Sequence, residues 1–244
     1  MPWWCTTPRP CTSTRAETVR PPAAAGGRLQ GVLFDMDGLL VDSEPEWFEV
    51  EREVFARFGA RREWSLEDAH SMVGVALPVS AARIAHLAGR PGDAALVATA
   101  LVDGMAERLG AGVPFKAGAR RLVTALMEQA VPMALVSSSV RRLVDVVLAE
   151  LPPAAFTASV AGDEVPAGKP HPDPYLEGLR LLGVPAGGAV VLEDSPTGAA
   201  SGHAAGCAVV VVPDRAPLPE SHPWTVVDTL ESVDPAWLAA RLGR

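Results

Sequence analysis

The chain has 244 residues, of which 48% are hydrophobic, so it can bury a sizeable core. Its formal net charge of -8 argues against a nucleic-acid partner, because nucleic-acid phosphates require a basic protein face. No apolar run is long enough to span a bilayer, so we expect no membrane partner. Three cysteines without a paired framework fit a reducing compartment, and we expect a cytoplasmic protein.

The first segment, residues 1–27, is rich in Pro, Thr, Arg and Ala and lacks the apolar core of a signal peptide. A segment of this composition buries too little apolar surface to pack, so we expect a disordered N-terminal extension. Its single acidic residue, Glu17, also fits a transit peptide, although the prolines would interrupt an amphipathic helix.

From Gly31 onward, short apolar strands alternate with helical patterns, which predicts an α/β fold with a doubly wound parallel sheet. The predicted strands cover residues 31–34, 132–136, 156–161, 189–192 and 207–212. Several are continuous apolar runs, as expected of strands that are buried on both faces. Cys207 begins the last run, where we expect it to pack as a small buried hydrophobe.

The interval between the first and second strands shows helical patterns and no convincing strand. Ser43 and Glu46 predict a capping box at the start of a helix that ends near Gly59. Further helix patterns begin at Ser65 and cover residues 79–87 and 92–109.

These patterns predict two domains. Residues 44–113 would form an inserted helical cap domain, and residues 28–43 and 114–244 would form the core domain. A cap over the carboxyl edge of the sheet would exclude water and select the substrate.

Two carboxylates, Asp35 and Asp37, follow the first strand at a turn that closes at Gly38. The first can act as a nucleophile or metal ligand, and the second can transfer protons. Asp and Gly are also favoured in turns for local backbone reasons, so this segment taken alone also fits a simple turn.

Two further polar segments follow later strands. The second strand leads into Ser137, Ser138 and Ser139, whose hydroxyl and N–H groups could bind an anion, although a serine-rich turn also fits a helix cap. Lys169 lies between Gly168 and Pro170, and its compact charge suits a phosphate or a crowded carboxylate.

The fourth segment places Glu193 and Asp194 at the end of another apolar strand. With Asp35 and Asp37, four carboxyl groups would converge on one edge of the sheet, and their repulsion favours a bound cation. Oxygen ligands without Cys or His favour Mg2+. We therefore expect a Mg2+ site among these four residues.

Together, the four segments and the helical insert resemble the haloacid dehalogenase-like (HAD) hydrolase superfamily. The resemblance covers roughly residues 29–212, with the insert where the beta-phosphoglucomutase-like and phosphoglycolate-phosphatase-like subfamily has its helical cap. Residues 39–47 are similar to the bacterial hexitol and 2-deoxyglucose 6-phosphate phosphatases. The resemblance implies a Rossmann-like HAD core.

The resemblance also implies catalytic roles. Asp35 would be the nucleophile and would form an aspartyl-phosphate. Asp37 would be the general acid and then the general base, and its backbone carbonyl would bind Mg2+. Ser137 and the backbone of Ser138 would hold the phosphoryl oxygens, and Lys169 would bind there, balance charge and orient Asp35.

For the metal site, the resemblance implies that Asp194 binds Mg2+ directly and that Glu193 supports the ion directly or through water. An Asp at position 37 favours phosphate-ester chemistry over dehalogenation. We therefore expect a Mg2+-dependent phosphatase, monomeric, that acts on small phosphorylated metabolites, in particular sugar or sugar-alcohol phosphates.

Two alternatives remain. The first is a phosphomutase of the beta-phosphoglucomutase type. Near Gly74, where that mutase carries basic residues, this chain has Val73 and Leu77, and Trp47 stands where the mutase has a hinge histidine. The second is a non-catalytic protein with a vestigial site, which the complete set of motif residues disfavours.

Overall fold

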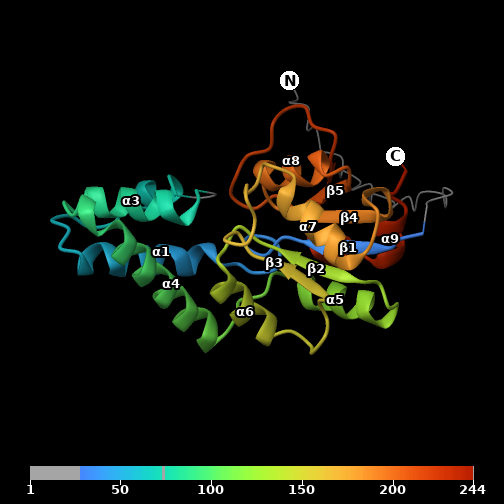
Figure 1. Ribbon diagram of the computed structural model, residues 1–244, viewed down its shortest axis with the longest axis horizontal. Coiled ribbons are helices and arrows are strands. Elements are labelled where there is room, and N and C mark those ends of the chain that lie inside the picture. The colour runs from blue at the N-terminus through green and yellow to red at the C-terminus, as the bar shows by residue number, and fades with distance from the viewer. Residues whose placement is uncertain (1–27, 73–74, 244) are drawn as a thin grey trace, which may run out of the picture.

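The computed structural model describes residues 28–72 and 75–243. Within this part, parallel strands form one six-stranded sheet in the order β3-β2-β1-β4-β5-β6 (Figure 1). The strands are β1 (Gly31–Phe34), β2 (Met133–Val136), β3 (Ala158–Val160), β4 (Ala189–Glu193), β5 (Ala208–Val211) and β6 (Thr225–Val226). The sheet confirms the α/β class and the five predicted strands. The short strand β6, which pairs with β5, was not predicted.

Helices cover both faces of the sheet. They are α5 (Ala119–Glu128), α6 (Arg141–Ala149), α7 (Asp173–Leu182), α8 (Pro196–Ala204) and α9 (Pro235–Ala239). Helices α7 and α8 bury Tyr175 and Ala199 against one face, where Leu33 and Val191 lie. The buried residues of α5, α6 and α9 belong to the cluster on the opposite face (Figure 1). Short 3-10 turns form at Pro91–Asp93, Ala186–Gly188 and Leu230–Ser232.

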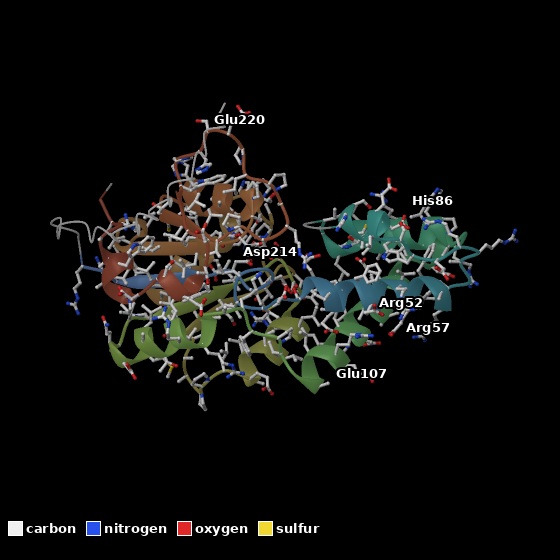
Figure 2. The ribbon with its side chains drawn as sticks, turned by 180° about the vertical axis from the view of Figure 1, so that it is seen from behind. Arg52, Arg57, His86, Glu107, Asp214 and Glu220 are labelled. Carbon is white, nitrogen blue, oxygen red and sulfur yellow. The ribbon has the colours of Figure 1, made fainter. Side chains whose placement is uncertain are left out.

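The interval after β1 is helical, as predicted. It contains α1 (Glu44–Arg57), α2 (Leu66–His70), α3 (Leu77–Leu87) and α4 (Ala94–Ala111). These helices lie together beside the sheet, and Figure 2 shows α1 and α4 side by side with Arg52, Arg57 and Glu107 labelled. The apolar residues of α1 and α4, such as Val50 and Met105, are buried in one cluster that continues into the core of the sheet. The proposed boundaries of a separate cap domain stay a prediction.

The start of α2 agrees with the sequence. Ser65 is its N-cap residue, and the side chain accepts a hydrogen bond from the backbone N–H of Asp68 at 3.1 Å. The Asp68 carboxylate accepts from the backbone N–H of Ser65 at 2.9 Å, which completes a capping box.

The capping box predicted at Ser43 is wrong. Ser43 is the N-cap residue of α1, but its side chain makes no capping hydrogen bond. Its backbone lies in the helical region, with φ -84° and ψ -16°, whereas capping serines have an extended backbone. The buried Ser43 hydroxyl instead donates to Asp37 Oδ1 at 2.7 Å, so it binds an acidic residue that follows β1.

Three further expectations concern Cys207, membrane-spanning helices and the N-terminal segment. Cys207 is buried, as predicted, and burial raises the pKa of its thiol to about 12. No helix in the described part of the chain is long and apolar enough to cross a membrane. The N-terminal extension, residues 1–27, and the loop at Val73 and Gly74 lie outside the described residues.

Candidate active site

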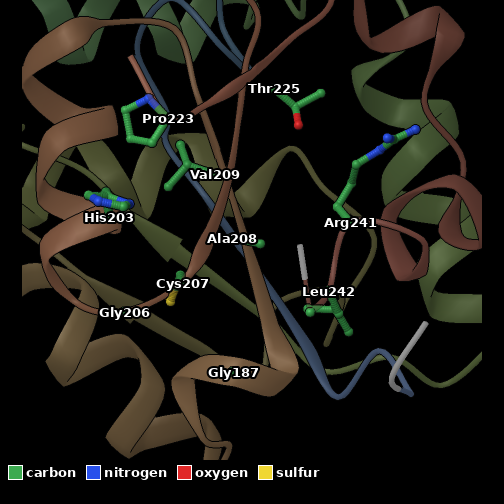
Figure 3. Close-up of a pocket in the computed structure, with 11 residues that line it drawn as sticks. Gly187, His203, Gly206, Cys207, Ala208, Val209, Pro223, Thr225, Arg241 and Leu242 are labelled. Atoms are coloured by element: carbon green, nitrogen blue, oxygen red, sulfur yellow. The ribbon is translucent and has the colours of Figure 1, made fainter. Parts of the chain in front are cut away.

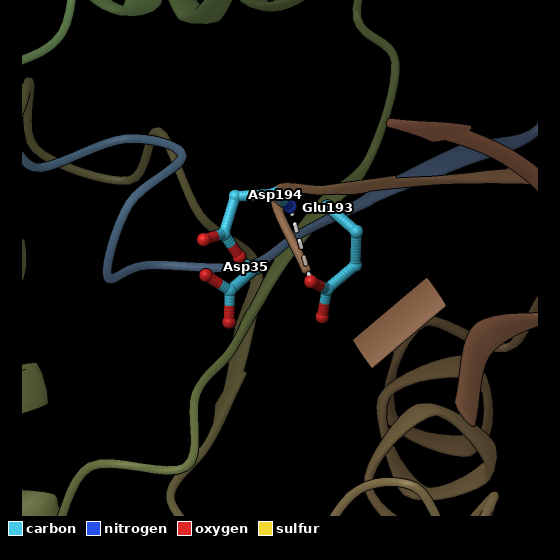
Figure 4. Close-up of side chains that lie close together, drawn as sticks. All are labelled: Asp35, Glu193 and Asp194. Atoms are coloured by element: carbon cyan, nitrogen blue, oxygen red, sulfur yellow. Dashed lines mark hydrogen bonds between the residues drawn. The ribbon is translucent and has the colours of Figure 1, made fainter. Parts of the chain in front are cut away.

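The acidic residues predicted to converge follow two neighbouring strands. β1 and β4 are paired in register from Gly31 with Ala189 to Phe34 with Leu192, so both strands end at the same edge of the sheet. Asp35 follows β1, whereas Glu193 ends β4 and Asp194 follows it. One carboxylate oxygen of each of these three residues lies within 4.8 Å of the others (Figure 4). The site therefore combines oxygen ligands suited to a hard cation.

Lys169 joins two of these carboxylates. Its Nζ donates to Asp35 Oδ1 at 2.5 Å, to Glu193 Oε1 at 2.7 Å and to the Val136 carbonyl at 3.0 Å. The Lys169 side chain is only 5% exposed, so these contacts are shielded from water. Lys169 thus lies between Asp35 and Glu193 and contacts both carboxylates.

The Glu193 carboxylate is fully buried and hydrogen-bonded through both oxygens. Oε1 accepts from Tyr175 Oη at 2.6 Å in addition to Lys169. Oε2 accepts from the backbone N–H of Asp194 at 3.1 Å and from Ser195 Oγ at 3.2 Å. Protein groups therefore fix the Glu193 carboxylate, whereas the described residues give Asp194 no side-chain hydrogen-bond partner.

Two glycines make room for these carboxylates. Gly38 has φ +85°, and a Cβ at this position would collide with the Asp194 carboxylate. A Cβ at Gly198, in the first turn of α8, would collide with the Glu193 carboxylate. Side chains at either position would displace the acidic residues, so the close approach requires glycine.

Serine hydroxyls hold the Asp37 side chain beside this acidic group. Oδ1 accepts from Ser43 at 2.7 Å, and Oδ2 accepts from Ser139 at 2.8 Å and from Ser137 at 3.2 Å. The structure thus brings together three of the four predicted carboxylates, whereas Asp37 lies beside Ser137. Its predicted contact with the metal, through a backbone carbonyl, does not require its side chain.

The serine segment after β2 lies against Asp37. Ser137 is 2% exposed, and its hydroxyl also accepts from the backbone N–H of Ser139 at 2.9 Å. The Ser138 side chain is exposed, and its backbone N–H donates to no acceptor among the described residues. That N–H is therefore available to an anion.

Burial and negative neighbours change the acidity of the site. Burial, with the charges of Glu193 and Asp37, raises the pKa of Asp35 to about 8 even though Lys169 opposes the shift. Burial, with the charges of Asp35 and Glu193, raises the pKa of Asp194 to about 9. Burial would lower the pKa of Lys169, but Asp35 and Glu193 outweigh it and raise that pKa above its ordinary value. A cation beside the acids would favour their charged forms.

For three residues of this site, the sequence did not predict the acidic partner. Ser139 and Ser43 bind Asp37, and Tyr175 binds Glu193. The serine run was a signal for Ser139, but Ser43 had been assigned to a helix cap, and nothing in the sequence singled out Tyr175. No local pattern indicates their acceptors, because the contacts of Ser139 and Tyr175 join distant segments.

A cavity of about 370 Å³ lies elsewhere (Figure 3). It is lined by Cys207, Ala208 and Val209 at the amino end of β5, together with His203 and Arg241 among others. The acidic group lies at the carboxyl ends of β1 and β4, so this cavity is not part of the candidate site.

Acidic residues at strand ends, a buried lysine between two of them and a serine turn thus lie at one edge of a parallel α/β sheet. The model of the family described as haloacid dehalogenase-like hydrolase matches residues 32–212. The chain belongs to this family, as the sequence motifs predict.

Comparisons with individual proteins support the family assignment. Hexitol phosphatase A of Escherichia coli (strain K12) is 34% identical over 188 residues, which cover 76% of this chain and 83% of the relative. Protein CbbY of Rhodobacter capsulatus is 31% identical over 196 residues, covering 77% of this chain and 86% of the relative. The crystal structure of CbbY from Rhodobacter sphaeroides in complex with phosphate has a TM-score of 0.75 and 25% identity, and the match covers 84% of this chain and 96% of that one.

Proposed function

We propose that the protein is a Mg2+-dependent phosphatase that hydrolyses small organic phosphate monoesters, in particular sugar or sugar-alcohol phosphates, through an aspartyl-phosphate on Asp35. The observation that carries this proposal is the Asp35 carboxylate, held by Lys169 beside Asp194 and Glu193 at a strand end. The hexitol phosphatase and the phosphate-bound CbbY structure support phosphate-ester chemistry and a phosphorylated substrate.

The residues present fit Mg2+. Three carboxylates supply oxygen ligands within 4.8 Å of one another, and these ligands suit Mg2+ better than softer metals. Asp35 and Asp194 would bind the ion with the Asp37 backbone carbonyl, and Glu193 would support the site from its hydrogen-bonded position. Bound there, Mg2+ would neutralise charge on the phosphate and the acids.

Asp35 would attack phosphorus in the first step. A new bond forms between its carboxylate oxygen and phosphorus, and the bond from phosphorus to the alcohol oxygen breaks. Lys169, bound to the other oxygen, would keep the Asp35 carboxylate oriented and support its charged form. Ser137 and the Ser138 N–H would hold the phosphoryl oxygens.

Asp37 would move the protons. It would donate a proton to the departing alkoxide and then accept one from the water that hydrolyses the aspartyl-phosphate. Hydroxyls of Ser43, Ser137 and Ser139 hold its carboxylate in place. Fixed geometry of this kind is what general acid-base catalysis requires.

Helices α1 to α4 would act as the substrate-selecting lid, with residues 44–113 as the cap domain. Their position directly after the nucleophile strand connects lid movement to Asp35 through only a few residues. Exclusion of water by such a lid would strengthen the interactions within the site.

The phosphomutase alternative is not favoured. A mutase must hold a bisphosphorylated intermediate, and this chain has Trp47 and Leu77 where basic residues or a histidine would be needed. Incubation with a sugar 1-phosphate separates the two functions, because a phosphatase releases inorganic phosphate whereas a mutase returns it to the sugar.

The proposed function is tested by a screen of phosphate monoesters with Mg2+, in which released inorganic phosphate is measured. Glu193→Gln and the surface variant Asp145→Asn are run in parallel, since Asp145 is an exposed acid outside the site. We expect turnover with wild type and Asp145→Asn and a strong loss with Glu193→Gln. Absence of turnover on every ester would contradict the proposal and favour a vestigial site.

A further inference from the structure

Glu51 is a buried acidic residue in α1, outside the acidic group of the candidate site. Only 6% of its surface is exposed, and it lies next to the apolar Val50 in the buried part of the helix. Glutamates are rarely buried without a partner that compensates for the lost hydration.

Glu51 has only half of its hydrogen-bonding capacity filled. Its Oε2 accepts from Trp64 Nε1 at 3.1 Å, and its Oε1 accepts from no group among the described residues. Nearby cations have other partners, since Arg52 pairs with Glu49 and Arg108 pairs with acids elsewhere on α1. Oε1 is not among the fully buried side-chain atoms that lack a partner, so it is open to solvent or to a ligand that the described residues do not provide.

The position of Glu51 relates it to the active site. Glu44 lies at the start of α1. Burial raises the pKa of the Glu44 carboxyl, and the negative charge of Asp37, which lies near it, raises that pKa further. Glu51 follows Glu44 by seven residues, so the two share one face of the helix and are offset by roughly 10 Å along its axis. This face thus extends from the proton-transferring acid to Glu51.

The chemistry of Glu51 suits a neutral hydroxyl. Burial raises the pKa of its carboxyl to about 7, with smaller contributions from the charges of Glu44 and Asp68, while Trp64 opposes the shift. Near neutral pH the group exists in both protonation states, so Oε1 can accept or donate a hydrogen bond, as a hydroxyl also can. Its protonated form would not repel the charge of a phosphate.

Building on the proposed phosphatase function, we propose that Glu51 is a specificity-determining residue that binds a hydroxyl of a polyhydroxylated substrate at the end remote from the phosphate. The offset of roughly 10 Å along α1 between Glu44, which lies near Asp37, and Glu51 is comparable to the length of an extended six-carbon chain, whose phosphate would lie at Asp35. Trp64 would fix the orientation of the carboxyl group through Oε2 and leave Oε1 facing the substrate.

The test compares two esters, a hexitol 6-phosphate and phenyl phosphate, which has no hydroxyl to bind. Glu51→Leu removes both oxygens, and Glu49→Leu is the matched control on the more exposed side of the same helix. We expect Glu51→Leu to lower kcat/KM for the hexitol phosphate by about 10- to 100-fold, mainly through KM, because a buried hydroxyl would lose its partner. Turnover of phenyl phosphate by Glu51→Leu should be unchanged. The Glu49→Leu control should keep the wild-type turnover of both esters.

A second pair of variants separates binding from structure. Trp64→Phe removes the orienting hydrogen bond but keeps the Glu51 carboxyl, so it should lower the preference for the hexitol phosphate less than Glu51→Leu does. Glu51→Met keeps a similar side-chain length without an oxygen and replaces Glu51→Leu if that variant does not fold, and it should reduce the preference in the same direction.

Equal losses on both esters, or unchanged preference in Glu51→Leu and Glu51→Met, would overturn the inference while leaving the phosphatase proposal intact. Preference of the wild-type protein for phenyl phosphate over every polyol phosphate would also overturn it. A wild-type protein that hydrolyses neither ester would instead contradict the proposed function on which the inference rests.

Discussion

Lys169 Nζ lies 2.5 Å from Asp35 Oδ1, and the same ammonium lies 2.7 Å from Glu193 Oε1. One buried cation therefore links the carboxylate after β1 to the carboxylate at the end of β4. The contact leaves the other oxygen of Asp35 for chemistry, and it offsets part of the repulsion among the acids.

We expect Asp35→Asn to lower turnover of every ester by about 10³-fold or more, because an amide cannot replace the carboxylate as a nucleophile. Steady-state phosphate release would measure the loss, and circular dichroism would verify the fold. Activity near the wild-type level with any ester would show that Asp35 does not attack phosphorus.

For Asp37→Asn, the leaving group decides the result. Phenolate leaves without a proton, so phenyl phosphate should phosphorylate Asp35 and give a burst of phenol, followed by a stall because hydrolysis lacks its base. A sugar phosphate needs the proton and should give no burst, with a rate loss of roughly 10² to 10⁴. Stopped-flow measurement of phenol release tests this difference. Equal and complete loss with both esters in a folded protein would contradict a proton-transfer role.

Metal binding should be visible in stability as well as in activity. Because three buried carboxylates lie within 4.8 Å, we expect Mg2+ to raise Tm, with about 2.7 kcal/mol of added stability at 100 times Kd. Asp194→Asn should lose most of this increase, whereas the exposed control Asp145→Asn should keep it. Full activity in excess chelator, or no Mg2+-dependent change in Tm, would contradict the metal site.

Glu51 should make stability depend on pH. Its carboxyl has an ordinary pKa of 4.5, and burial raises it to about 7 in the folded protein, so the folded state binds the proton more tightly. The stabilisation is fully present below about pH 4.5 and is lost as pH rises through about 7. Relative to Glu51→Gln, the Tm of the wild-type protein should therefore fall between pH 5 and pH 8, by roughly 2–4 °C if 1 kcal/mol is lost. Parallel Tm curves for the two proteins would contradict the shifted pKa.

The sequence predicts the sheet well where the apolar runs are continuous. β1 and β4 are buried along their whole length, so the end of each run locates the acidic residues correctly. β6 has only two residues and lacks such a run, which is why it was missed.

Side-chain partners were harder to predict. Ser43 fits a capping pattern locally, yet the folded chain places its hydroxyl against Asp37. Tyr175 meets Glu193 only because α7 packs on the sheet, and the buried Glu51 beside Trp64 depends on packing within the helical segment. Residue order along the chain does not determine these contacts, because they arise from tertiary packing.

The central claim is covalent catalysis by Asp35, and peptide mass spectrometry tests it most directly. Asp37→Asn would be incubated with phenyl phosphate and Mg2+, quenched in acid and digested, with Asp35→Asn/Asp37→Asn as the control. The account predicts one phosphoryl group on the peptide that contains Asp35, labile to hydroxylamine and absent from the double variant. Phenol release by Asp37→Asn without a phosphoryl group on Asp35, or with the group on another residue, would contradict it.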